Sequence, residues 1–404
     1  MRWAIAACAL VLASAALAQT PLTPPANEIV EHFRAYRAAL DAGDLATAET
    51  EAAAALEASA ARDGDGGRTG ILAMNLAQVR LDRGRAAEAL EPARHAFAIA
   101  SANGQSGLDP LVARLAVGRA ETAANGQAGA DALEASLIAA QGRDDLIQAR
   151  HGATVALAGY YMDRGNYARA AQHWSAAYPL AAGSPGGERF GRAEARLGEG
   201  MSRGLHNMET ESPLTIGTNI PRTRDYNASL EALSEAAQLA ATLAYDGFEG
   251  ELTAAQSVYA QSLAWRALLL IRLAPNDRAA FLAREEELDD GVEVAFTPRP
   301  GEAGRPICQM RLIQEPDVEY PTQARARASV GVVVLRFSLA SNGAITERRT
   351  AVSLPGRWFS EAVDRVADQW RFEQAAGQSI HCVAPRTIFT PITFRIVDNI
   401  MRPN

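Results

Sequence analysis

The sequence predicts a multidomain protein in which an α-helical solenoid precedes a small α+β domain. Two observations support this fold class. Turns marked by glycine return about every forty residues in the first half of the chain, and two strands, a helix and a further strand follow one another between Tyr320 and Val397. The length of 404 residues is sufficient for two or three domains. Apolar residues make up 48% of the chain, so a substantial buried core is expected.

Four glycines mark equivalent turns of the predicted array. They are Gly43, Gly84, Gly126 and Gly165, and their spacings are 41, 42 and 39 residues. Each follows an apolar helical stretch and precedes another stretch in which alanine recurs. Self-similarity at a fixed period of this size is typical of stacked helical repeats. We therefore predict a helical repeat domain over residues 27–290.

The clearest repeat runs from Leu157 to Ala170 and contains the turn Asp163-Arg-Gly165-Asn166. It resembles the first helix, the tight turn and the start of the second helix of a tetratricopeptide repeat. The resemblance implies an array that binds extended peptides or protein surfaces, with a rigid spacer as the alternative. Glycine-rich segments at 63–67, 103–107 and 183–187 are predicted to separate successive helix pairs.

The C-terminal region carries several local signals that agree with one another. Gly331 to Leu339 reads as an apolar strand, and Asn342-Gly343 favours a hairpin turn because both residues tolerate positive φ. A strand near Ile345 to Val352, an amphipathic helix and a last strand from Thr387 to Val397 follow. The apolar face of that helix is formed by Phe359, Ala362, Val363 and Val366, which fall at helical spacing.

These elements, together with Tyr320-Pro321 and Trp370-Arg371-Phe372, resemble the C-terminal domain of the TonB family of bacterial energy transducers. We place this domain at residues 307–398, after a proline- and glycine-rich linker at 291–306. The resemblance implies that a short peptide from an outer-membrane TonB-dependent transporter adds as a strand to the edge of the sheet. The peptide-binding residues that it implies are Tyr320, Pro321, Ile388, Thr390, Ile392, Phe394 and Ile396.

The N-terminus reads as a signal peptide over residues 1–18. Arg2 supplies a positive charge, an apolar run follows to Leu17, and Ala16-Leu17-Ala18 fits a small-residue cleavage site before Gln19. We therefore predict an exported, periplasmic interaction protein. One alternative is an energy transducer anchored in the inner membrane by an uncleaved N-terminal segment, and another is an envelope scaffold.

Charge argues against nucleic acid as the main partner. The net charge is −8, and residues 19–305 hold 26 arginines against 38 acidic residues. Residues 306–404 hold 12 arginines against 9 acidic residues, which is a small excess over about a hundred positions. Phosphate binding requires clustered positive charge, and the chain lacks it.

Two cysteines, Cys308 and Cys382, remain after removal of the signal peptide, and both flank the C-terminal domain. In an oxidising compartment such a pair favours a disulfide, with two buried thiols as the alternative. The sequence contains no nucleophile elbow, zinc-protease motif, phosphate loop or dinucleotide fingerprint. We therefore expect no enzyme activity, no cofactor and no metal site.

Overall fold

A computed structural model describes residues 26–102, 107–209, 226–244, 251–273, 275–288, 308, 310–314, 317–327, 329–340, 343–374, 387–397 and 400–403. The predicted signal peptide (1–18) and linker (291–306) lie outside the described residues. The chain forms two compact units, residues 1–191 and residues 192–404.

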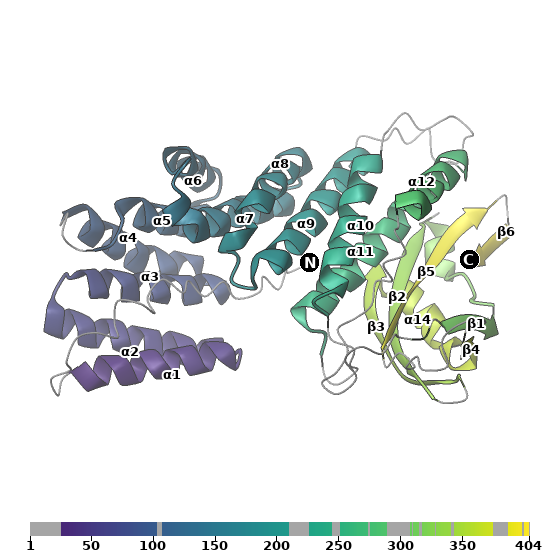
Figure 1. The fold of residues 1–404 in the computed structure, drawn as a ribbon, viewed down its shortest axis with the longest axis horizontal. Coiled ribbons are helices and arrows are strands. Elements are labelled where there is room, and N and C mark those ends of the chain that lie inside the picture. Colours follow the sequence, from purple (N-terminus) through teal and green to yellow (C-terminus); the bar gives the residue numbers. More distant parts are fainter. Residues whose placement is uncertain are drawn as a thin grey trace. The chain divides into compact units, whose positions relative to one another are not determined.

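The first unit is built from helices that pack as consecutive hairpins (Figure 1). The hairpins are α1 (Ala26–Asp41) with α2 (Leu45–Asp63), α3 (Gly67–Asp82) with α4 (Ala86–Ala102), α5 (Pro110–Asn125) with α6 (Gln127–Ala139), and α7 (Ile147–Asp163) with α8 (Tyr167–Ala177). Short 3₁₀ helices, η1 (Asp144–Leu146) and η2 (Tyr178–Gly183), flank the last hairpin. The predicted helical repeat array is therefore confirmed for this unit.

The four predicted turn glycines lie between the two helices of the four hairpins. Their φ angles are 73° at Gly43, Gly84 and Gly165, and 66° at Gly126. This backbone region is strained for residues with a Cβ atom, so glycine allows a tight reversal between the two helices. Small side chains then allow neighbouring helices to approach closely. Ala48 of α2, for example, is fully buried against α1 and α3.

A buried carboxylate fastens the first hairpin to the second. The side chain of Glu49 on α2 is only 9% exposed and pairs with three arginines at the end of α3 and in the turn that follows. Nε of Arg80 lies 3.0 Å from one carboxylate oxygen, Arg83 binds the other, and Arg85 donates to both. Burial raises the pKa of Glu49, whereas the hydrogen bonds from the three guanidinium groups lower it. The net effect is a lowered pKa.

The second unit combines the helices α9 to α14 with two sheets in the part of the chain that the structure describes. The first four of these helices are α9 (Glu188–Glu209), α10 (Asn227–Ala241), α11 (Ala254–Leu270) and α12 (Pro275–Leu288). The strands are β1 (Met310–Gln314), β2 (Gly331–Leu339), β3 (Ile345–Leu354), β4 (Arg371–Gln374), β5 (Ile388–Val397) and β6 (Ile400–Pro403), with α13 (Thr322–Ala326), α14 (Arg357–Asp364) and η4 (Ala367–Gln369) among them.

Both sheets of the second unit are antiparallel in the part of the chain that the structure describes. Strands β1 and β4 form a two-stranded sheet, and the larger sheet has the order β3-β2-β5-β6. The β2–β5 register is regular and runs from Gly331 opposite Phe394 to Phe337 opposite Ile388. The predicted fold class, a helical solenoid followed by an antiparallel sheet with a helix, is therefore confirmed.

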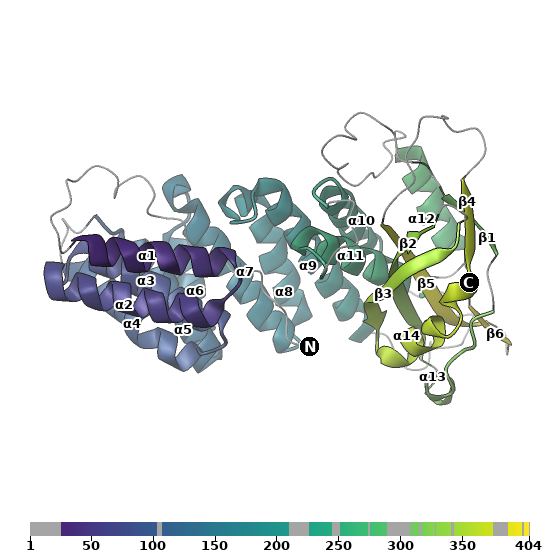
Figure 2. The same ribbon diagram turned by 90° about the horizontal axis from the view of Figure 1, so that it is seen from below.

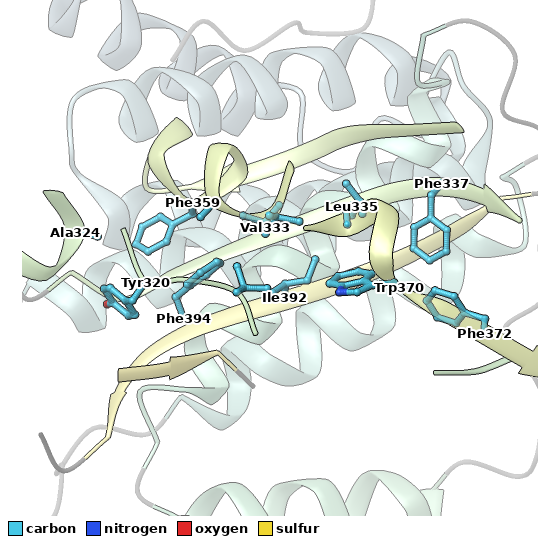
Figure 3. Packing of buried hydrophobic residues seen from close by; sticks show 14 residues of the cluster. Tyr320, Ala324, Val333, Leu335, Phe337, Phe359, Trp370, Phe372, Ile392 and Phe394 are labelled. Atoms are coloured by element: carbon cyan, nitrogen blue, oxygen red, sulfur yellow. The ribbon is translucent and has the colours of Figure 1, made fainter. Parts of the chain in front are cut away.

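One face of the larger sheet forms the core with α14 (Figure 3). Val333, Leu335 and Phe337 of β2 point into this core because alternate residues of a strand share a face. Phe359 of α14 packs there, as predicted, as do Ala362 and Val363. Val366 follows the end of the helix rather than lying within it, and it packs partly buried against the same cluster.

Helix α11 covers the opposite face of the same sheet (Figure 1). It contacts β2, β3 and β5, and the ring of Tyr259 meets that of Phe389 edge-on with centroids 5.6 Å apart. Val332 and Val334, which alternate with the residues that face α14, are fully buried. The compact units thus place α11 with the sheet, whereas the predicted boundaries place it with the repeats. Those boundaries stay a prediction.

Candidate functional site

The residues that the sequence implies for peptide binding lie on β5 and just before α13. Strand β5 pairs with β2 along seven residues and with β6 along Phe394 to Val397. The predicted edge strand is therefore not outermost over its whole length, because β6 lies outside its last four residues. Figure 2 shows β5 and β6 side by side, as the register requires.

Tyr320 belongs to the core. It is 3% exposed, and its ring meets those of Phe359 and Phe394 nearly at right angles, with centroids 6.1 and 5.9 Å away. Its hydroxyl donates a hydrogen bond to the main-chain carbonyl of Ser329, and burial raises its pKa. Pro321 is also buried and precedes the first turn of α13. This pair fixes how the chain approaches the sheet.

Three of the predicted β5 residues contribute to the same core. Ile392 is 3% exposed and Phe394 is fully buried, and Ile388 packs partly buried against the cluster (Figure 3). Thr390 is half-buried, and the side chain of Ile396 lies outside the described residues. These side chains hold the strand in place. A peptide added beside β5 would therefore meet its main chain rather than these side chains.

The two sides of the larger sheet differ in how well they suit an added strand. Strand β3, at one end of the sheet, has two register shifts against β2 and carries Glu347, Arg348 and Arg349 in sequence. Arg348 also reaches Asp368, with 2.5 Å between guanidinium nitrogen and carboxylate oxygen. Bulges and charges of this kind protect an edge from further pairing. The β5 side has no register shift against β2.

Pro391 identifies which side of β5 faces outward. It lies in the middle of the strand opposite Val334 and is exposed. Proline has no N–H to donate, so within a sheet it occurs where that side of the strand faces away from a neighbouring strand. Its position indicates that the missing donor is on the outer side of β5, away from β2.

Sequence reasoning missed several elements of this region, among them the strands β1 and β6 and the α11 layer. A signal for β6 was present, because Asp398-Asn399, residues common in tight hairpin turns, precedes Ile400-Met401. No comparable signal identifies the sheet as the partner of α11. Cys308 is buried, and Cys382 lies outside the described residues, so their predicted disulfide stays a prediction.

The described residues hold no group of three or more histidine, cysteine or acidic side chains arranged to bind a metal ion. Within that same part of the chain, no helix combines the length and the apolar character that crossing a bilayer requires. Burial is the main cause of the shifted pKa values of Asp82 on α3, which is raised, and of His151 on α7, which is lowered.

Comparison with known families identifies the C-terminal domain. Residues 316–396 match the profile of the family described as Gram-negative bacterial TonB protein C-terminal. The match covers about a fifth of the 404 residues, begins after β1 and ends before β6, and does not include α11. It confirms the resemblance that the sequence motifs indicated. No curated protein matches the chain.

Proposed function

From the TonB-type C-terminal domain, we propose that this chain is a protein-interaction component of the bacterial envelope that binds an extended peptide by strand addition beside β5. The observation that carries the proposal is that this strand is long, regular in register and bounded on its outer side, among the described strands, by the short β6 alone. The partner is a peptide segment of an outer-membrane TonB-dependent transporter.

Strand addition suits the chemistry of this edge. Main-chain hydrogen bonds supply the affinity, and pockets for alternate side chains of the peptide supply specificity. Ile392 and Phe394 are buried in the core on one face of the sheet and keep β5 rigid. The sheet therefore loses little conformational entropy when the peptide binds. The protein has no catalytic role in this proposal.

The helical array of the first unit serves as a second binding element in this proposal, and it holds another protein. Export by a signal peptide places both elements in the periplasm, with Cys308 and Cys382 joined in a disulfide. An intact Met1 in the inner-membrane fraction would instead favour an anchored energy transducer. Two titratable thiols in the denatured mature protein would refute the disulfide.

The proposed binding mode is tested with synthetic peptides from the periplasmic N-terminal segments of TonB-dependent transporters. Each main-chain amide of a binding peptide is methylated in turn, and the affinity is measured by calorimetry. Strand addition predicts that affinity falls at every second position, because alternate N–H groups point toward β5. A loss with no alternation, or at no position, would contradict strand addition and favour an envelope scaffold.

A further inference from the structure

Strand β6 lies on the side of β5 that the proposed function assigns to the partner. It lies beside β5 (Figure 1). The two strands pair antiparallel in a continuous register, with Arg402 opposite Arg395 and Ile400 opposite Val397. An added strand cannot occupy the same positions, because each main-chain group of β5 makes its ladder bonds on a given side with one neighbour. The C-terminal segment of the chain therefore competes with a partner for the last four residues of β5.

The form of β6 also makes it a poor strand to build upon. It has only four residues, Ile400 to Pro403, against ten in β5. It ends in Pro403, which lies opposite Phe394 and has no N–H to extend the ladder. Short length and proline are features that prevent further pairing at a sheet edge. A partner strand thus has neither the end of β5 nor a suitable edge on β6.

We propose that β6 is a stop that sets the register and the length of the bound peptide. This inference rests on the proposed function, and it adds a determinant of specificity to it. The peptide strand runs beside the first part of β5, from Ile388, and ends where Pro403 meets Phe394. A peptide longer than about six residues gains no additional main-chain pairing, because its remaining residues would overlap β6.

The matched segment of the chain ends at residue 396, so β6 is outside the part that this chain shares with the family profile. The stop is therefore inferred from the pairing in this structure alone. The proposed partner is still an extended polypeptide, which β5 recognises through main-chain amide and carbonyl groups.

The test compares a six-residue and a ten-residue version of the tightest transporter peptide on the full chain, by calorimetry. We expect the two versions to bind the intact chain within twofold of each other. Removal of residues 398–404 should leave the six-residue affinity unchanged and tighten the ten-residue peptide at least tenfold. Tenfold corresponds to about 1.4 kcal/mol, the net contribution of one or two main-chain hydrogen bonds.

A pair of point variants guards against misfolding of the shortened chain. Arg402→Pro removes the N–H at the position opposite Arg395, whereas Arg402→Ala keeps the main chain of β6 intact. The proline variant should behave like the shortened chain, and the alanine variant like the intact one. Hydrogen exchange of β2, measured in all variants, reports whether the sheet remains folded.

Three outcomes overturn the inference in distinguishable ways. A ten-residue peptide that binds the intact chain much more tightly than the six-residue one would mean that partners displace β6. An unchanged ten-residue affinity after removal of residues 398–404 would mean that β6 does not border the binding edge. If neither peptide binds any variant, the proposed function fails together with the stop.

Discussion

The packing of α11 on the sheet leads to a quantitative prediction. The rings of Tyr259 on α11 and Phe389 on β5 meet at 86° with centroids 5.6 Å apart, and Phe389 is 9% exposed. Edge-to-face aromatic pairs contribute about 0.5–1.5 kcal/mol beyond the burial of each ring. Phe389→Ala alone should cost about 3–5 kcal/mol, as is usual for a phenylalanine removed from a core. Tyr259→Ala should cost less because that ring is only partly buried.

A double-mutant cycle isolates the contact between the two rings. Because a chain with two compact units does not unfold in one step, the free energies should be taken from hydrogen exchange of β2 and β5 peptides rather than from global denaturation. We expect a coupling energy of about 1 kcal/mol between Tyr259→Ala and Phe389→Ala. The control is a cycle between Tyr259→Ala and Ile392→Ala. Because Ile392 lies on the opposite face of β5, its coupling to Tyr259 should be clearly smaller.

A coupling below about 0.3 kcal/mol between Tyr259 and Phe389 would equal the scatter expected for independent sites and would refute the reasoning. It would mean that α11 does not pack on the sheet in solution. The C-terminal domain would then behave as the separate module that the sequence alone suggests. A coupling near 1 kcal/mol would make the helix pair α10 and α11 part of the peptide-binding unit.

Three further predictions concern single positions. Burial raises the pKa of Asp82 to about 6 from 3.8, so its ionised form destabilises the fold as pH rises through this window. Asp82→Asn should raise the free energy of unfolding at pH 7 by up to about 3 kcal/mol, with no gain below pH 4, measured by hydrogen exchange of α3 peptides against pH. Burial, followed by the charge of Arg119, lowers the pKa of His151 from 6.5 to about 4. Relative to a His151→Gln variant, the unsubstituted protein should therefore lose up to about 3 kcal/mol of stability as pH drops from 6.5 to 4. The same pH profile in both proteins would contradict this assignment. Gly343→Ala should destabilise the protein far more than Gly43→Ala in the same kind of assay. The two glycines share nearly the same φ, but only at Gly343 would an added Cβ meet another atom, a carbonyl oxygen 1.8 Å away. Equal losses of stability would contradict this geometry.

Much of the fold follows from local chemistry and was therefore predictable. The turns at Gly43 and Gly165 were identifiable because a positive φ favours glycine wherever it occurs. The apolar strand predicted from Gly331 to Leu339 is β2, because a continuous run of β-branched and apolar residues suits a strand that is buried on both faces. The TonB-type motifs depended on the same local features, and the family match to residues 316–396 confirmed them.

The candidate site was only partly predictable. The sequence predicted β5 as the strand that a peptide would meet, which stays a prediction, and it treated Tyr320 and Phe394 as contact residues. The structure places both in the core, because the face of a strand that is buried depends on what packs against it. Alternation divides the residues of a strand into two sets. It does not say whether either set remains accessible once helices cover both faces.

The sequence by itself determined the turns of the repeat array, the long strands β2, β3 and β5 with the helix between them, and that the last domain is of the TonB type. Tertiary structure alone decided that α11 covers the second face of the sheet and that β6 lies beside the end of β5. Residues of α11 as far apart in sequence as Val258 and Leu270 are buried, which predicts a covered helix but not the identity of its cover. The physical reason is that an apolar surface has no directional preference: it packs on whatever complementary surface the rest of the chain brings to it.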